Sequence, residues 1–275
     1  MSQQDKMGTI SILGAGWLGL PLGAALVRRG FAVKGSTTRE EKRPLLEKEG
    51  LQAFLIRVEE ELLMSPANED FFRSDVLFIN IPPGRRRPDV ADAFPRQLKS
   101  IVDQAIGKGV QKIIFVSSTS VYASEGQMAR EEDELAPETA SGIALKRSEE
   151  YLQQQKVDWV ILRLAGLVGG DRKAGRFFAG RKDIAGGLSP VNMVHRDDCI
   201  AVISQILLQQ KWGQIFNVCA DEHPSRSDFY TAQAHKQGFE LPTFTANYKS
   251  HKIVSNEKVK RELQYTFLHP DPMAF

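Results

Sequence analysis

The fold of this 275-residue chain is decided by one stretch, TISILGAGWLG, which runs from Thr9 to Gly19. An apolar run typical of a buried strand (Thr9–Leu13) leads directly into the pattern G-x-G-x-x-G. A helical pattern follows over Trp17–Arg29, and a second strand pattern begins at Ala32. A strand, a glycine turn, a helix and a second strand in this order form the βαβ unit that binds dinucleotides.

Each glycine of this turn has an expected role. Gly14 allows a tight turn, Gly16 lets the backbone approach a pyrophosphate, and Gly19 lets the helix pack closely on the sheet. Backbone N–H groups around Trp17 and Leu18, at the start of the helix, then hold the anion. The alternative is a glycine turn that only packs a strand on a helix.

Strand and helix patterns alternate along the first part of the chain, which predicts an α/β fold. Strands are expected at Thr9–Leu13, Ala32–Gly35, Ala53–Ile56, Val76–Ile81, Lys112–Val116 and Trp159–Leu164, and helices near Trp17–Arg29, Arg39–Glu49, Val90–Ile106 and Ser141–Gln154. We therefore expect a Rossmann-type, doubly wound parallel sheet. One face of the 90–106 helix is expected to belong to the core, with Ala93, Leu98, Ile101, Val102 and Ala105.

The pattern loosens in the last part of the chain. Residues 166–187 are rich in Gly, Arg and Lys and predict a loop, followed by a strand at 191–194. Further elements are expected at Ile200–Leu208, capped by Asp197 or Asp198, and at Ile215–Cys219, Tyr230–Lys236 and Glu257–Leu263. The prediction is one NAD(P)-binding Rossmann-like domain over residues 1–275. Its dinucleotide-binding core would occupy 1–165, and a small C-terminal substrate lobe in 166–275 would be interleaved with closing elements of that core.

Composition excludes several classes of protein. Lys and Arg exceed Asp and Glu by 36 − 34 = 2, so no general attraction to nucleic acid or anionic membrane is expected. The two cysteines, Cys199 and Cys219, form no C-x-x-C pair, so we expect no disulfide framework and no metal site. Residues 1–8 lack the apolar core of a signal peptide, and no apolar run approaches about 18 residues. A cytoplasmic protein is expected.

The segment after the second strand bears on the choice of dinucleotide. It reads Ser36-Thr37-Thr38-Arg39, where an NAD-binding unit carries an acidic residue for the ribose. Arg39 can pair with a 2′-phosphate, and Ser36 or Thr37 can donate hydrogen bonds to it. NADP is therefore preferred, with NAD as the alternative. Thr38 can also be explained as the cap of a helix that starts at Arg39.

Several further segments resemble the extended short-chain dehydrogenase/reductases, the NAD-dependent epimerase/dehydratase superfamily. They are Phe115–Tyr122 (FVSSTSVY), Ile161–Gly169 (ILRLAGLVG), Met193–Asp198 (MVHRDD), Phe216–Val218 (FNV) and the helical pattern in Ser255–Leu263. Their order spans nearly the whole chain and is most similar to an atypical bacterial subgroup, the YeeZ-like proteins. The resemblance implies an oxidoreductase or isomerase that uses a nicotinamide cofactor, with a nucleotide sugar as the leading substrate class. It also allows a homodimer.

The resemblance assigns candidate residues to the catalytic and cofactor sites. Ser118 occupies the place of the family serine, which hydrogen-bonds a substrate oxygen. Ile81 ends the expected fourth strand and Pro82 follows it, at the carboxyl edge of the sheet, where we expect both to contact the cofactor.

The chain departs from the family at two motifs. Its glycine pattern is GxGxxG, whereas extended members usually carry GxxGxxG. The tyrosine of the catalytic Tyr-x-x-x-Lys motif is missing. One alignment places Ser141 at the tyrosine and Leu145 at the lysine; the other keeps Lys146 and places Gly142 at the tyrosine.

Without that tyrosine, the proton donor is open. The candidate catalytic residues are Ser118, Tyr122, Ser141 and Lys146. Ser141 is a weak substitute because an alcohol is far less acidic than a phenol. Tyr122 can also be explained as an aromatic packing residue or part of the substrate wall.

Basic residues and one histidine suggest contacts with a phosphorylated substrate. Arg85 is expected on the loop after the fourth strand, and Arg163, Arg176 and His195 in or next to the substrate region. The alternatives are a solvated basic surface and a hydrogen-bonded structural histidine.

Three functions remain open at this stage. The first is an NADP-dependent oxidoreductase or isomerase acting on a small molecule. The second is a dinucleotide-binding redox sensor or regulatory protein without turnover. The third keeps the cofactor but uses Tyr122 or His195 as the acid.

Overall fold

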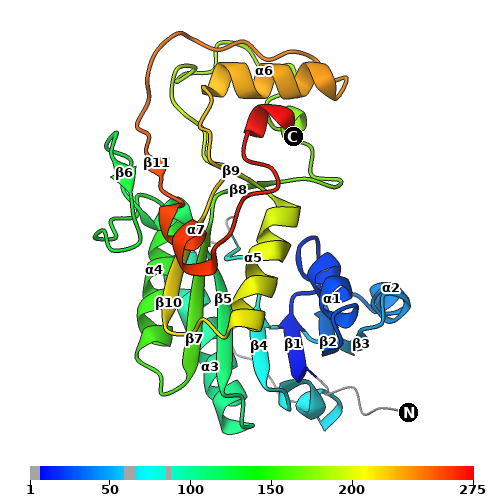
Figure 1. The fold of residues 1–275 in the computed structure, drawn as a ribbon. Coiled ribbons are helices and arrows are strands. Elements are labelled where there is room, and N and C mark those ends of the chain that lie inside the picture. Colours follow the sequence, from blue (N-terminus) through cyan, green and yellow to red (C-terminus); the bar gives the residue numbers. More distant parts are fainter. Residues whose placement is uncertain (1–6, 59–65, 85–87) are drawn as a thin grey trace. The chain divides into compact units, whose positions relative to one another are not determined.

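A computed structural model describes residues 7–58, 66–84 and 88–275 (Figure 1). The chain forms two compact units. Unit 1 comprises the chain up to Val121 together with Pro137–Leu162 and Gln210–Gln214. Unit 2 comprises Tyr122–Ala136, Arg163–Gln209 and Ile215–Phe275. The chain thus passes between the units several times. The sequence suggested a core over 1–165 and a small lobe over 166–275, interleaved with closing elements of that core.

The central sheet has seven strands, in the order β10-β7-β5-β4-β1-β2-β3. Its strands are β1 (Thr9–Leu13), β2 (Ala32–Thr37), β3 (Gln52–Leu55), β4 (Val76–Ile79), β5 (Lys112–Ser118), β7 (Asp158–Leu164) and β10 (Gln214–Val218). The strand β1 pairs in parallel with both β2 and β4, and the order reverses at β1 as in Rossmann folds. The predicted α/β fold class is confirmed, and each predicted strand of the first part lies within a few residues of an observed one.

Four helices of unit 1 follow the predicted pattern closely. They are α1 (Gly19–Val27), α2 (Arg43–Lys48), α3 (Val90–Gly107) and α4 (Ala140–Gln153). The five residues expected on the core face of α3 are all buried. Helix α3 packs beside α4, and between them Arg147 Nη1 lies 2.5 Å from Asp92 Oδ1.

Unit 2 contains two short parallel pairs of strands and three helices. The pairs are β6 (Met128–Ala129) with β11 (Ile253–Val254), and β8 (Gly166–Val168) with β9 (Met193–His195). The helices are α5 (Arg196–Gln209), α6 (Arg226–Lys236) and α7 (Glu257–Leu263). A small apolar core is formed by Val168, Ala174, Val191, Met193 and Phe229.

Two predictions about unit 2 are wrong. Residues 166–187 are not all loop, because β8 and a 3-10 turn at Ala174–Phe177 lie within them. Helix α5 begins at Arg196, before the two expected cap residues, so Asp197 and Asp198 lie in its first turn and are not its caps. In both cases, contacts with segments distant in sequence determine the structure, and the local residue pattern does not show them.

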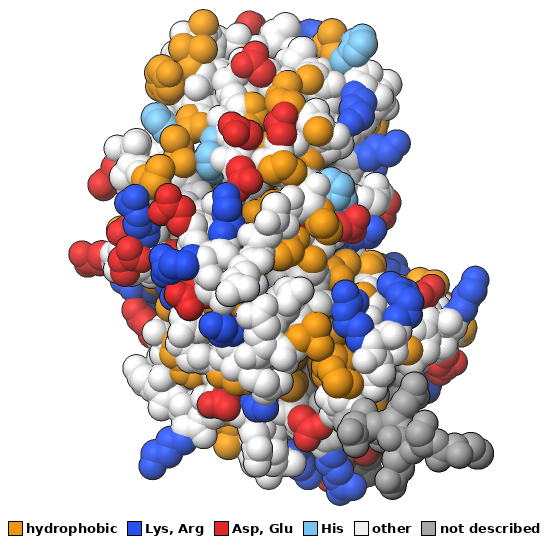
Figure 2. Space-filling view, viewed as in Figure 1, with side chains coloured by type: hydrophobic (Ala, Val, Ile, Leu, Met, Phe, Trp, Pro, Cys, Tyr) orange, Lys and Arg blue, Asp and Glu red, His pale blue; other side chains and the backbone are white. Residues whose placement is uncertain are grey.

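The described part of the chain offers no helix that combines the length and apolar character needed to cross a membrane. Both cysteines are buried and unpaired, and burial raises the pKa of the Cys219 thiol to about 12. On the face shown in Figure 2, basic and acidic side chains are interspersed. No single sign of charge dominates that face.

Candidate functional site

The turn between β1 and α1 depends on its glycines. Gly14 has a φ of +98°, and a Cβ added there would lie 2.6 Å from the carbonyl oxygen of Asn80. A Cβ added at Gly19 would collide with the carbonyl oxygen of Gly14. Gly16 is exposed, and a Cβ there would meet no atom within 4 Å. Two glycines are therefore required by the fold, whereas the open side of Gly16 leaves the backbone accessible to a ligand.

Hydrogen bonds from neighbouring strands hold this turn in place. The N–H of Gly14 donates to Ser36 Oγ at 2.9 Å, and the N–H of Ala15 donates to the Ser36 carbonyl at 2.8 Å. The side-chain amide of Asn80, just after β4, donates to the Gly14 carbonyl at 3.1 Å. Ser36 is only 3% exposed, so its observed role is to fasten β2 to the turn, whereas the sequence suggested a contact with a 2′-phosphate.

The carboxyl end of β2 carries two exposed arginines. Arg39 follows β2, and its N–H donates to Thr37 Oγ1 at 3.2 Å. Arg57 follows β3, and its Nε donates to the Thr38 carbonyl at 3.2 Å. Thr38 does not cap the next helix, since the 3-10 turn Glu40–Lys42 has Arg39 at its N-cap and no side-chain cap bond. The end of β2 therefore presents guanidinium groups where an NAD-binding unit presents a carboxylate.

Arg57 and Asn80 were not identified from the sequence. Arg57 reaches Thr38 because β2 and β3 pair in parallel, with Thr37 opposite Leu55. No regular spacing of residues in the sequence predicts a contact of this kind. Asn80 had a usable signal, because it directly follows a strand at the carboxyl edge of the sheet.

The loop after β4 is described only in part. The side chain of Ile81 lies 3.5 Å from the position of a Cβ at Gly14, so it borders the glycine turn. Pro82 is exposed nearby in sequence. Arg85 lies outside the described residues.

The start of α4 packs against the turn that follows β5. A Cβ at Gly142 would lie 2.6 Å from the Ser120 carbonyl oxygen, and Thr139 caps α4 by accepting the N–H of Gly142 at 3.0 Å. Ser118 ends β5, and its Oγ accepts the N–H of Ser120 at 3.1 Å. The helix start that carries Ser141 is thereby brought next to the turn that follows Ser118.

This packing bears on the two alignments of the Tyr-x-x-x-Lys motif. Gly142 has no room for a side chain, so a phenol does not fit at that position. The alternative places Ser141 at the tyrosine and Leu145, which is 3% exposed, at the lysine. Lys146 is half-buried and lies 4.0 Å from Glu150 along the helix.

In unit 2, Tyr122 and Arg163 belong to a buried polar network. The Tyr122 hydroxyl donates to Asn217 Oδ1 at 2.8 Å and accepts from Arg163 Nη1 at 2.6 Å. Arg163 is 2% exposed and also donates to the Glu131 carbonyl at 3.1 Å. Burial raises the pKa of Tyr122 to about 12, with Arg163 acting in the opposite direction.

These contacts argue against two of the candidate roles. A buried phenol with both hydrogen bonds made and a raised pKa is a poor proton donor near neutral pH. Arg163 directs its guanidinium into the same network, which does not suit contact with substrate. The geometry therefore favours structural roles for Tyr122 and Arg163.

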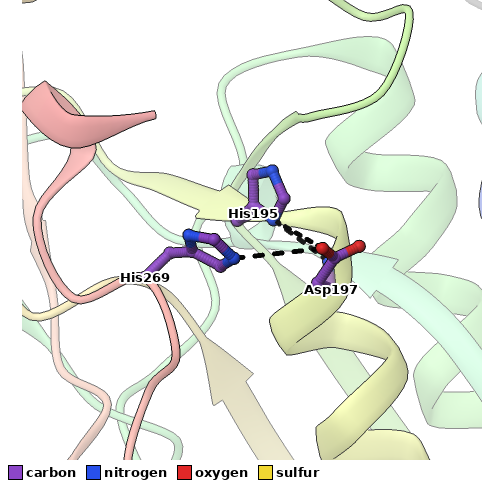
Figure 3. Close-up of side chains that lie close together, drawn as sticks. All are labelled: His195, Asp197 and His269. Atoms are coloured by element: carbon purple, nitrogen blue, oxygen red, sulfur yellow. Dashed lines mark hydrogen bonds and ion pairs between the residues drawn. The ribbon is translucent and has the colours of Figure 1, made fainter.

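The remaining candidates of unit 2 have different surroundings. Arg176 is exposed on the 3-10 turn Ala174–Phe177. His195, at the end of β9, lies beside Asp197 and His269 (Figure 3). Its pKa is lowered, first by burial and then by the neighbouring imidazole of His269. His269 was not identified from the sequence, because it lies far along the chain from His195.

The geometry agrees with comparisons to known proteins. The family model for NAD(P)H-binding proteins matches residues 14–210. Protein YeeZ of Escherichia coli K12 is 38% identical over 275 residues, which cover 98% of each chain. A structure of UDP-glucuronic acid 4-epimerase from Bacillus cereus, in complex with UDP-glucuronic acid and NAD, matches with a TM-score of 0.78 at 18% identity, covering 97% of this chain and 96% of that one.

A structure of a conserved protein of unknown function from Silicibacter pomeroyi has the same TM-score of 0.78 at 23% identity, with 97% and 96% of the two chains covered. These two structures establish the fold, and the family match and YeeZ establish the relationship. The chain therefore belongs to the NAD(P)H-binding family and is a relative of protein YeeZ.

Proposed function

We propose that this protein binds NADP, in preference to NAD, at the turn between β1 and α1, and uses it in an oxidoreductase or isomerase reaction on a small molecule. The observation that carries the proposal is the accessible backbone at Gly16 within a turn fixed by Gly14 and Gly19. The first turn of α1 holds no acidic residue, so its positive end is available to a pyrophosphate.

The preference for NADP rests on Arg39 and Arg57. Both are exposed at the carboxyl end of neighbouring strands, and β2 carries no carboxylate there. A 2′-phosphate would gain charge-assisted hydrogen bonds from two guanidinium groups. The ribose hydroxyl of NAD would gain much less, since it carries no charge.

The nicotinamide would supply hydride transfer. Ser118 would then hydrogen-bond the substrate oxygen, and Ser141 would lie at the place of the missing phenol. The nucleotide-sugar ligand of the Bacillus cereus epimerase suggests a nucleotide sugar as the substrate.

A second function is favoured by the start of α4. Ser141-Gly142 offers no acidic hydroxyl of phenol type, and Tyr122 is held in a buried network. A protein that binds the dinucleotide without rapid turnover would report the redox state of the nicotinamide pool.

Cofactor binding is tested by titrating the protein with NADPH and NADH while following nicotinamide fluorescence. We expect saturable NADPH binding that is tighter than NADH binding and is lost in Gly16→Asp, where a carboxylate faces the pyrophosphate. Equal or tighter NADH binding would remove the preference for NADP. If the protein binds neither NADPH nor NADH, the glycine turn serves packing alone.

Turnover is tested separately with UDP-glucuronic acid and UDP-glucose as substrates in the presence of the preferred dinucleotide. Product formation that falls in Ser118→Ala, with dinucleotide binding unchanged, supports the enzyme. Dinucleotide binding without turnover on either sugar nucleotide favours the sensor.

A further inference from the structure

We propose that His195, Asp197 and His269 form a binding site for a divalent transition metal, with Zn²⁺ as the best-matched ion. All three residues belong to unit 2. The proposal therefore does not depend on the dinucleotide site. It rests on three metal-binding side chains that converge from two distant segments of the chain.

The potential ligand atoms of the three residues lie within 4.8 Å of one another (Figure 3). Asp197 Oδ2 is 3.7 Å from His195 Nδ1 and 3.9 Å from His269 Nε2. Ligand atoms around a tetrahedral Zn²⁺ are separated by roughly 3.3 Å, which follows from metal–ligand distances near 2.0–2.1 Å. Small side-chain rotations would therefore close the group around an ion.

The imidazole of His195 packs directly against Gly169. A Cβ added at Gly169 would lie 2.6 Å from His195 Nε2, so the ring occupies space that only glycine leaves free. The ring centroid of Phe275 lies 5.6 Å away on another side. Such packing directs Nδ1, rather than Nε2, toward Asp197.

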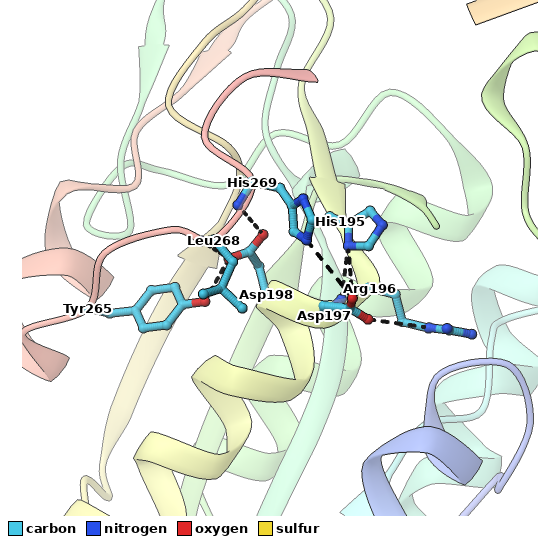
Figure 4. Close-up of polar contacts among 7 residues, drawn as sticks. All are labelled: His195, Arg196, Asp197, Asp198, Tyr265, Leu268 and His269. Atoms are coloured by element: carbon cyan, nitrogen blue, oxygen red, sulfur yellow. Dashed lines mark hydrogen bonds and ion pairs between the residues drawn. The ribbon is translucent and has the colours of Figure 1, made fainter. Parts of the chain in front are cut away.

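The position of His269 is fixed by the buried carboxylate of Asp198 (Figure 4). Asp198 accepts hydrogen bonds from the Tyr265 hydroxyl and the Leu268 N–H, both at 2.6 Å, and from the His269 N–H at 3.1 Å. A segment about seventy residues further along the chain is thereby fastened to the first turn of α5. Residues that hydrogen-bond to metal ligands commonly fix the position of those ligands in this way.

The hydrogen bonding of His195 is compatible with metal binding. The N–H of Asp197 donates to His195 Nδ1 at 3.3 Å, so that nitrogen carries a lone pair. The two imidazole centroids are only 3.9 Å apart, so the two rings lie together beside Asp197. A metal ion would take up the lone pairs and the carboxylate charge together, and would replace the long hydrogen bond to the amide.

Charges around the group are compatible with this role. The second oxygen of Asp197, Oδ1, faces Arg196 Nε at 3.9 Å, which leaves Oδ2 for the two imidazoles. Two histidines and one carboxylate supply three protein ligands. This number leaves a fourth tetrahedral position for water or an exogenous ligand, as in sites where zinc acts on bound molecules.

The experiment uses the full chain, freed of metal by chelation, and titrates it with Zn²⁺ by calorimetry and with Co²⁺ by visible absorption. We expect one equivalent of each ion to bind and Co²⁺ to show the intense bands of four-coordinate geometry. His269→Gln and Asp197→Asn should each weaken Zn²⁺ binding by at least about 100-fold, since even outer partners of metal ligands contribute 10–100-fold.

His235→Gln is the matched control, because His235 is exposed on α6 outside the group. It should bind Zn²⁺ as the parent protein does. Circular dichroism of the metal-free variants establishes that each is folded. A parent protein that binds no equivalent, or variants at His269 and Asp197 that bind as the parent does, would overturn the proposal.

Discussion

The carbonyl oxygen of Ser120 lies where a side chain at residue 142 would begin, because a Cβ on Gly142 would be 2.6 Å from it. This contact sets how closely α4 approaches the turn after β5. It also excludes a tyrosine at Gly142 and leaves Ser141 as the residue that the other alignment places at the family tyrosine. The close packing of one glycine thus decides which chemical groups the start of α4 can offer.

Replacement of Gly142 should therefore be costly. Gly142→Ala should lower the free energy of unfolding by about 1–3 kcal/mol, because backbone atoms must shift to admit the methyl group. Gly107→Ala, at the end of α3 with no atom within 4 Å of its Cβ, is the matched control. It should be neutral or stabilising by up to about 1 kcal/mol. Urea unfolding of both variants measures the difference, and equal values would contradict the packing argument.

The glycines of the first turn should separate folding from binding. Gly16→Ala should fold with nearly the parent stability, because its Cβ meets nothing, but should weaken NADPH binding by at least about tenfold through lost backbone approach. Gly19→Ala should lower stability, because its Cβ collides with the Gly14 carbonyl. Thermal unfolding and fluorescence titration of both variants check this. Parent-like NADPH affinity in Gly16→Ala would place the ligand elsewhere.

The two arginines at the end of β2 and β3 should control the choice of dinucleotide. Arg39→Ala and Arg57→Ala should each weaken NADPH binding by about tenfold, as loss of a charge-assisted hydrogen bond implies, and leave NADH binding nearly unchanged. Arg73→Ala is the control, since Arg73 is exposed ahead of β4, at the other end of a strand. Equal losses of NADPH and NADH affinity would assign the arginines to a part that both dinucleotides share.

Tyr122 should prove structural. Tyr122→Phe leaves Arg163 and Asn217 without the hydroxyl that joins them, so the free energy of unfolding should fall by about 1–3 kcal/mol. Tyr248→Phe, at a side chain that is 65% exposed, should change it by less than about 0.5 kcal/mol. Denaturant unfolding measures both. A catalytic phenol would give the opposite result, with unchanged stability and a reduced rate of turnover.

Glu131 should make stability fall as pH rises above its ordinary pKa of 4.5. Burial raises the pKa of this carboxyl, so the folded protein binds its proton more tightly than the unfolded chain does. Above pH 4.5 the folded state therefore holds more protons, and the slope of unfolding free energy with pH from this group is negative.

Glu131→Gln removes this dependence and keeps an oxygen to accept the N–H of Asn217. Relative to the parent, the variant should gain stability between pH 4.5 and pH 7, because the raised pKa of Glu131 no longer contributes to the unfolding free energy. Glu134→Gln, at an exposed position, should show no such trend. Urea unfolding at a series of pH values tests both, and a gain toward low pH would contradict the assignment.

Local signals predicted most of unit 1. The structure of Thr9–Gly19 could be predicted because a strand, a turn and a helix start follow one another without interruption. Each of these elements requires its own residue types. The core face of α3 was readable from its helical period for the same reason. Such features need no knowledge of distant segments.

Features that depend on distant segments could not be predicted. Asp198 is a residue type that commonly caps helices, yet its carboxylate accepts the N–H groups of Leu268 and His269. Arg57 reaches β2 only through sheet pairing. The burial of Tyr122 follows from partners that are 41 and 95 residues away in sequence. Residue type indicates that a polar group needs a partner, but not which segment provides it.

The division of the chain into units has a consequence for its inheritance. Unit 2 is assembled from three separate stretches, Tyr122–Ala136, Arg163–Gln209 and Ile215–Phe275, with pieces of unit 1 between them. No single contiguous stretch of the gene encodes unit 2. Recombination at one breakpoint therefore cannot pass it intact to another Rossmann protein. Transfer of unit 2 as a whole would require exchange of all three stretches together.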